Sequence, residues 1–322
     1  MEKKSKMNIT DIQNKTIEKD DIKLLLLTRD SKKSIYIYDI DIDDSLRDFF
    51  YNNKVALLEK HKNTEIKKYD YIYNEEGFVL ELSADDIENL DFSNKFSNML
   101  ERKTKFIGLS SIKDKKQKLF AYCIKYYDRS SNDSFYSFTK IQPSKISSDE
   151  KRNSLRAKFS TNGAKLTEYK DETISFNQNI DFILYKNTYL IFNKAMFEQI
   201  VDIAKHIEKK SNDAINQIKT AATIEGVNYL EDFAKGNTLL QRRIIKINQI
   251  GIFRSLDKEK LEKISKVGKK YNIKVTIENN KLIIHNTRED VENVCKLLCD
   301  YFKKGEITGD PYGTYGGDNL KH

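Results

Sequence analysis

The chain has few cysteines and prolines, and no apolar run approaches the ~20 residues that a membrane-spanning helix needs. Its three cysteines form an odd set without the spacing of a disulfide framework. No basic-then-apolar signal segment opens the sequence. The two prolines, Pro143 and Pro311, leave no proline-rich linker. We therefore expect a soluble protein that functions in a reducing cytoplasm.

Metal and catalytic signatures are equally scarce. The four histidines lie outside any recognisable nucleophile or zinc motif: His61, His206, His285 and His322. Cys295 and Cys299 are four residues apart on an expected helix, but no second Cys or His pair completes four zinc ligands. We expect these two thiols to pack in the interior, and we predict no cofactor and no resident metal.

One short pattern leaves an enzymatic alternative open. Glu65-Ile66-Lys67 has the Glu-x-Lys spacing of metal-dependent nucleases, and Asp43 or Asp44 upstream offers a second carboxylate for Mg²⁺. Such triplets arise repeatedly by chance in a chain that is 33% charged. A non-enzymatic protein is the main prediction.

Positive charge is concentrated in two stretches. Residues 1–100 hold 16 Lys/Arg and 21 Asp/Glu, whereas residues 101–170 hold 17 and 7. Residues 235–274 hold 12 basic and 3 acidic side chains, although the whole chain is only +8. Uniform lysine enrichment does not produce such clusters, so they predict surfaces that bind a polyanion.

Charge clustering alone selects the candidate DNA-contacting side chains. No zinc-finger, leucine-zipper or ribonucleoprotein-type signature is present, so we expect contacts with the phosphate backbone and little sequence preference. The candidates are Arg102, Lys103, Lys105, Lys113, Lys115, Lys116, Lys118, Lys151, Arg152, Arg156, Lys158, Arg242, Arg243, Lys246, Arg254, Lys263, Lys266 and Lys270. A third interpretation remains, in which the chain is a scaffold whose basic blocks bind acidic surfaces of itself or of a partner.

Periodicity predicts an α+β fold with a strand-rich first half. Strands are expected at 22–28 and 34–42, a helix over 45–60 capped by Ser45, and an extended segment near 69–73. Between 105 and 192, runs rich in β-branched and aromatic residues predict a mixed or antiparallel sheet, beginning with 106–110. We expect residues 1–21 to be a polar tail and 22–192 to be one domain.

The second half is predicted to be mainly helical over 193–305, followed by a glycine-rich tail over 306–322. Asn193 is expected to cap a helix that reaches Gly226, and two further helices are expected at 237–250 and 257–270. A hairpin near 272–285 turns at an Asn-Asn pair. A last helix starts near Thr287 and runs to Gly305, burying Phe302, so that 257–303 forms a helix-hairpin-helix unit.

The second half also resembles the B subunit of the Kiwa anti-phage defence system and its domain relatives. The likeness lies in FNKAMFEQI, the long helix after it, LLQRRIIKINQIGIF, the helix-hairpin-helix unit and a closing EITGDPYG, which together cover about 180–315. The positions that match are Asn193, Phe197, Glu198, Thr308 and Tyr312.

This resemblance implies a cytoplasmic, dimeric DNA-binding effector that blocks phage DNA replication without cutting DNA. It also implies docking at the inner face of the cell membrane, on a small multi-span membrane protein, the Kiwa A-type subunit. The resemblance assigns no DNA-contacting residues, so the candidates above rest on charge clustering.

Overall fold

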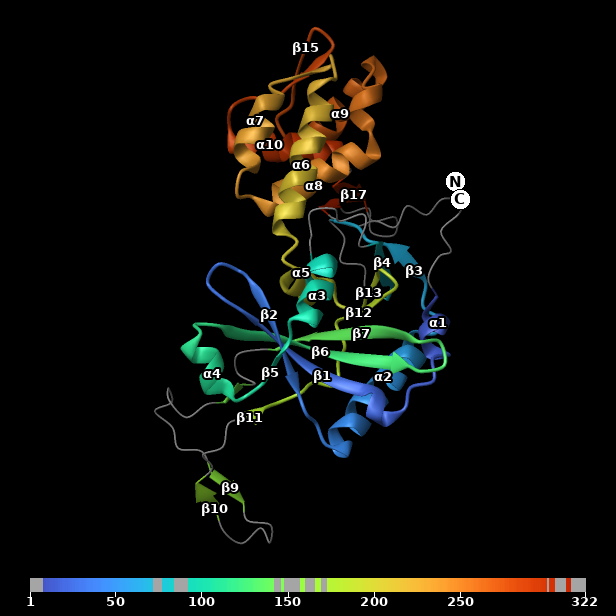
Figure 1. Cartoon of the computed structure of the whole chain (residues 1–322). Coiled ribbons are helices and arrows are strands. Elements are labelled where there is room, and N and C mark those ends of the chain that lie inside the picture. The colour runs from blue at the N-terminus through green and yellow to red at the C-terminus, as the bar shows by residue number, and fades with distance from the viewer. Residues whose placement is uncertain are drawn as a thin grey trace. The chain divides into compact units, whose positions relative to one another are not determined.

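The computed structural model describes residues 8–71, 77–83, 92–141, 146–147, 157–159, 166–168, 173–299, 301–304 and 311–313. The chain forms two compact units (Figure 1), of which unit 1 comprises Met1–Lys68 and Gly77–Val201, and unit 2 comprises Tyr69–Glu76 and Asp202–His322. Each unit has its own apolar core. The predicted α+β class, with a strand-rich first half and a helical second half, is confirmed. No helix among the described residues has the length and hydropathy to span a bilayer.

Unit 1 is built on a nine-stranded sheet with the order β3-β4-β13-β12-β7-β6-β1-β2-β5. Neighbouring strands are antiparallel except at the two edges, where β3 joins β4 and β5 joins β2 in parallel. The strands are β1 (Ile22–Arg29), β2 (Ile35–Ile40), β3 (Ile66–Lys68), β4 (Val79–Ser83), β5 (Thr104–Lys105), β6 (Lys118–Asp128), β7 (Asp133–Lys140), β12 (Phe182–Tyr185) and β13 (Thr188–Ile191).

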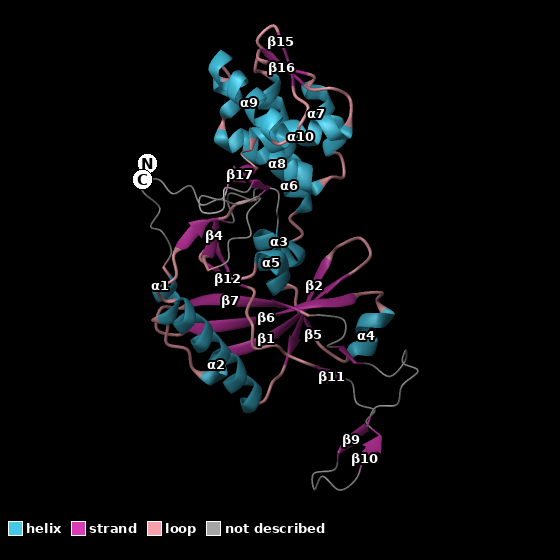
Figure 2. Cartoon of the chain, turned by 180° about the vertical axis from the view of Figure 1, so that it is seen from behind, coloured by secondary structure: helices cyan, strands magenta, loops and turns pink. Residues whose placement is uncertain are grey.

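Helices cover both faces of this sheet, as Figure 2 shows, which explains why its central strands are apolar on both sides. On one face, the Tyr126 hydroxyl donates to the Phe50 carbonyl of α2 at 3.1 Å. On the other, the Phe96 ring of α3 meets the Phe138 ring edge-on at 5.1 Å. The helices of unit 1 are α1 (Ile9–Gln13), α2 (Asp44–His61), α3 (Phe92–Glu101), α4 (Leu109–Asp114) and α5 (Lys194–Val201). Two small antiparallel strand pairs are also present, one between β8 (Ile146–Ser147) and β11 (Thr173–Ile174), the other between β9 (Ala157–Phe159) and β10 (Leu166–Glu168).

In the part of unit 2 that the structure describes, helices α6 to α10 pack with a three-stranded sheet of order β14-β16-β15. The predicted helix-hairpin-helix unit is present as α9, β15, β16 and α10, with Asn279 and Asn280 at φ values of 50° and 57° in the turn. Asp257 and Thr287 cap its helices, as expected. The elements are α6 (Ala204–Lys219), β14 (Ile224–Glu225), α7 (Val227–Ala234), α8 (Thr238–Ile250), α9 (Lys258–Lys270), β15 (Thr276–Glu278), β16 (Lys281–Ile283), α10 (Arg288–Leu298), β17 (Phe302–Lys304) and β18 (Pro311–Gly313).

Three local predictions in the first half are wrong. Asp43 caps α2 instead of Ser45, because its carboxylate accepts the Leu46 N–H at 2.9 Å one turn into the helix. The apolar segment 106–110 is no strand, since α4 begins within it and the short strand β5 precedes it. The extended segment expected at 69–73 is displaced to β3, and residues 72–73 lie outside the described part.

Two helix predictions in the second half also fail. The helix expected from Asn193 to Gly226 ends at Val201 and restarts at Ala204, because Asp202 adopts a left-handed φ of 56° that no α-helix continues through. The last helix ends at Leu298, and Phe302 starts β17 instead of lying in the helix. Periodicity detects the apolar face of a helix but not a single residue that breaks it.

Candidate nucleic-acid interface

Three predicted contact residues gather around the edge strand β5. Arg102, Lys103 and Lys105 are all exposed. Lys103 forms an ion pair with Asp39 of β2, and the Lys105 Nζ lies 3.6 Å from a carboxylate oxygen of Asp41. This edge therefore carries its positive charge beside two acidic side chains.

A second exposed group lies between α4 and the start of β6. Lys115, Lys116 and Lys118 point into solvent, with the Lys115 Nζ 5.5 Å from the centroid of the Tyr38 ring. Lys116 occupies the turn with a left-handed φ of 54°. Lys118 stands opposite Arg29 in the β1–β6 register. Lys113 lies in α4, and its side chain is outside the described part.

The remaining candidates of the first block are only partly described. Lys151, Arg152 and Arg156 lie outside the described residues, and Lys158 is placed by its backbone alone, in β9 opposite Thr167. Within the first block, the described basic surface therefore runs over 102–118.

The side chains of three candidates in the second block contact other residues of unit 2. Arg243 is only 2% exposed, with its guanidinium 6.0 Å from the centroid of the Tyr301 ring. Arg242 donates to the Tyr71 carbonyl, and the Lys246 Nζ lies 3.0 Å from a carboxylate oxygen of Asp70. Arg243 belongs to the core of unit 2, and Arg242 and Lys246 are half-buried against Tyr71 and Asp70 of the same unit, so we leave these three out of the proposed surface.

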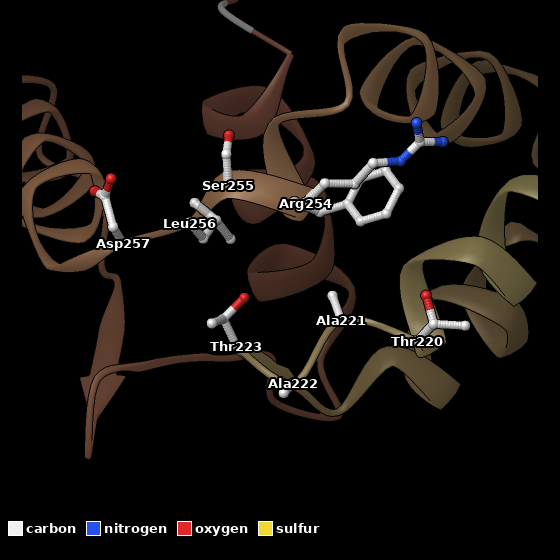
Figure 3. A pocket seen from close by; sticks show the side chains of 9 residues that line it. Thr220, Ala221, Ala222, Thr223, Arg254, Ser255, Leu256 and Asp257 are labelled. Atoms are coloured by element: carbon white, nitrogen blue, oxygen red, sulfur yellow. The ribbon is translucent and has the colours of Figure 1, made fainter.

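Arg254 lines an open depression of about 600 Å³ in unit 2. Figure 3 shows the segment 220–223 on one side and Arg254, Ser255, Leu256 and Asp257 on the other. The Arg254 guanidinium donates to the Gln217 Oε1 at 2.8 Å, and Asp257 adds a carboxylate to the same wall. This mixture of charges does not single out an anionic ligand.

The remaining candidates form a basic helix face on α9. Lys263, Lys266 and Lys270 are exposed, whereas Leu261 and Ile264 are buried in the core, as periodicity predicted. Lys263 forms an ion pair of 2.6 Å with Glu259, which raises the pKa of the lysine. All three ammonium groups are therefore displayed to solvent, and all three lysines follow Glu262, the last acidic residue of the helix.

Gly268 folds the chain back against the end of this helix. The Ile273 N–H donates to the Gly268 carbonyl at 2.8 Å, and a Cβ at Gly268 would lie 2.8 Å from the Val275 Cγ2. This close approach returns Lys274 toward the last turn, where Lys269 is also exposed. Neither lysine was selected from sequence, although the acid-free run 263–274 was a signal for both.

The residues of the nuclease alternative have other local roles. Asp43 caps α2, Asp44 forms an ion pair of 3.0 Å with Arg47, and the Lys67 Nζ lies 3.3 Å from the centroid of the Phe78 ring. No group of three or more His, Cys, Asp or Glu side chains that would suit one metal ion occurs among the described residues. All three cysteines are buried and unbridged, which confirms the predicted packing of Cys295 and Cys299.

The residues of the family likeness have structural positions. Asn193 caps α5, with its side-chain oxygen accepting the Met196 N–H at 3.3 Å. Phe197 is fully buried and packs edge-on against Phe182 at 5.0 Å. Glu198 follows in α5, Tyr312 stands opposite Lys303 in the β17–β18 pair, and Thr308 lies outside the described residues.

Comparison with known proteins identifies the family of this chain. A family model described as Kiwa protein KwaB-like matches residues 115–308, a span that includes the helix-hairpin-helix unit and most of the central sheet strands. No curated protein and no solved structure matches the chain. Because the family match covers more than half of the 322 residues, the chain belongs to the Kiwa protein KwaB-like family, a component of the Kiwa anti-phage defence system.

Proposed function

We propose that this protein is the DNA-binding effector of its Kiwa system and binds duplex DNA through phosphate contacts. The observation that supports this most is the surface formed by α9 and the segment after it. Residues 263–274 include five lysines and no acidic residue, and all five lysines are exposed: Lys263, Lys266, Lys269, Lys270 and Lys274. We call these five side chains the α9 surface.

The spacing of the α9 surface suits a DNA strand. Lys263 and Lys270 are seven residues apart, which corresponds to about 10 Å along a helix at 1.5 Å per residue. One DNA strand carries a phosphate about every 3.4 Å along the duplex axis, so this length is matched by about three phosphates. Contacts of this kind position a protein on the duplex without reading its bases.

The biological part of the proposal rests on family membership. In it, the protein is cytoplasmic and dimeric, docks on a small multi-span membrane subunit of the Kiwa system, and blocks phage DNA replication without cutting DNA. Phosphate contacts with little sequence preference suit that task, because an effector of this kind must recognise many different phage genomes.

Fluorescence anisotropy with a labelled duplex of arbitrary sequence tests the binding. If about six to ten phosphates are contacted in total, affinity falls about 10³- to 10⁵-fold between about 50 and 200 mM salt. Absent binding, or binding independent of salt, refutes the proposal.

A pair of charge reversals tests the surface itself. Lys266→Glu combined with Lys270→Glu is expected to weaken DNA binding more than tenfold, because two contacts become repulsive. The matched control reverses Lys209 and Lys210, which are exposed on α6 of the same unit. If the α9 variant keeps its DNA affinity but loses assembly in gel filtration, the basic face is a protein-binding scaffold. The buried Arg243 is unsuitable for this test, since reversing its charge would disrupt the core.

A further inference from the structure

A pair of lysines that is absent from the sequence-based candidates lies on the sheet of unit 1. Lys23 of β1 stands directly opposite Lys125 of β6 in the antiparallel register. Residues paired in this way have Cβ atoms about 4.5–5.5 Å apart, and two like charges so placed destabilise a sheet. Figure 1 shows β6, β1, β2 and β5 side by side at this edge of the sheet.

Lysines from the β5 segment extend this pair. Leu25, two residues after Lys23, is opposite Asp39, which in turn is opposite Lys105. Side chains at such positions share one face of a sheet, because the strand period is two residues. Lys103 reaches the same Asp39 as an ion pair.

The carboxylates around the pair are engaged by other cations. Lys103 forms an ion pair with Asp39, Lys105 with Asp41 at 3.6 Å, and Arg129 with Asp21 at 2.7 Å. Lys23 is two residues after Asp21, and Leu25, the next residue on the same face of β1, is opposite Asp39. The cross-strand pair therefore contributes two positive charges beyond those that the neighbouring carboxylates offset.

The Lys125 side chain packs partly against the sheet instead of extending fully into solvent. Its side chain is half-buried, with Nζ 5.8 Å from the centroid of the Tyr127 ring, whereas Lys23 is exposed. Burial lowers the pKa of Lys125, and the positive charges of Lys23 and Lys103 lower it further. An anion bound here would relieve this repulsion.

We propose that Lys23 and Lys125, flanked by Lys103, form a phosphate-binding site on the sheet of unit 1. The chemistry is recognition of a phosphate dianion or diester by ammonium groups. As a contact for a DNA backbone phosphate, the site rests on the proposed function and adds a surface on unit 1 to the α9 surface. A free phosphate compound offers the same chemistry, and the experiment separates the two sources.

The test uses the full chain with Lys23→Gln and Lys125→Gln combined. Its matched control is Lys60→Gln with Lys68→Gln, which removes the same charge from exposed positions on α2 and on β3 at the opposite edge of the sheet. Thermal unfolding with pyrophosphate and anisotropy with a labelled duplex are measured on wild type, variant and control. Removing the like-charge pair is expected to leave the thermal midpoint of the unliganded variant unchanged or raised, which shows that the variant folds.

For a DNA site, the double variant loses about 10- to 100-fold in affinity at about 0.1 M salt. The slope of log affinity against log salt becomes shallower by about 1.8, or about 0.9 per lost contact. For a site specific to free phosphate compounds, pyrophosphate raises the midpoint of wild type and control but not that of the variant, and DNA binding is unchanged. If variant and control behave alike in both assays, the site is refuted, whereas wild type that binds no DNA refutes the proposed function separately.

Discussion

Replacing Lys54 with methionine is expected to stabilise unit 1 at neutral pH. Lys54 is 3% exposed in the middle of α2, between Phe50 and Leu58 of the core. Its Nζ lies 4.4 Å from the centroid of the Tyr51 ring and 5.8 Å from that of Tyr126. Among the described residues, no carboxylate lies within ion-pairing distance of this ammonium group.

The expected magnitude follows from the effect of burial on protonation. Burial lowers the pKa of Lys54 from 10.5 to about 8. At pH 7 the lysine is protonated in the folded and the unfolded state, so this difference corresponds to about 3 kcal/mol of destabilisation at 1.36 kcal/mol per pH unit. Methionine removes that cost and also loses cation–π attraction worth about 0.5–2 kcal/mol. The net gain in unfolding free energy is therefore about 1–2.5 kcal/mol.

The pH dependence gives an independent check. Because the folded-state pKa is the lower one, the unfolded chain binds more protons between pH about 8 and 10.5, and this contribution to stability rises with pH across that window. Urea unfolding of wild type, Lys54→Met and the exposed control Lys60→Met at pH about 7 and about 10 measures the effect. We expect the gap between wild type and Lys54→Met to narrow at the higher pH. A less stable Lys54→Met at pH 7, or a gap that does not change with pH, refutes the reasoning.

Further outcomes can be measured on the same protein. Gly226→Ala is expected to cost at least about 2 kcal/mol in urea unfolding, because φ is 79° and the new Cβ would lie 2.1 Å from the Ile284 carbonyl oxygen. Gly236→Ala, with φ of 72° but open space, should cost clearly less, and equal losses would contradict the packing argument. Burial raises the pKa of the Asp181 carboxyl to about 6, so the folded state binds more protons between pH about 4 and 6 and stability falls as pH rises through this window. Asp181→Asn should flatten that fall, and an unchanged pH profile would contradict it. Plasmid incubated with Mg²⁺ or Mn²⁺ is expected to stay intact, whereas cleavage that is lost in Glu65→Gln would identify a nuclease.

Local signals in the sequence predicted the helix-hairpin-helix unit well. Asp257 and Thr287 satisfy the first N–H groups of their helices within three residues, and the Asn-Asn pair adopts the left-handed turn without help from distant segments. Elements decided by distant contacts were missed. The apolar periodicity of the sequence places Phe302 in an amphipathic helix, but in the structure Phe302 lies in β17 and pairs with Gly313. Periodicity carries no information about such a partner.

The candidate site was predicted only in part, for a related reason. Clustered charge marks where basic residues are numerous but does not say which way each points. Helix α8 is buried on most of its circumference, including Gln241 and Ile245, so Arg243 turns inward even though it lies in a basic stretch. Lys23 was missed because its partner Lys125 lies about 100 residues away in the sequence, and only the sheet register brings them together.

The same register has a consequence for synthesis on the ribosome. Strand β1 pairs with β6, and β4 pairs with β13, across roughly 100 residues in each case. At translation rates of about 5–20 residues per second, β1 and β4 are synthesised on the order of 5–20 s before these partner strands. During that interval their backbone edges are available to other nascent chains. Production of this defence protein in quantity is therefore expected to depend on chaperones that shield unpaired strands.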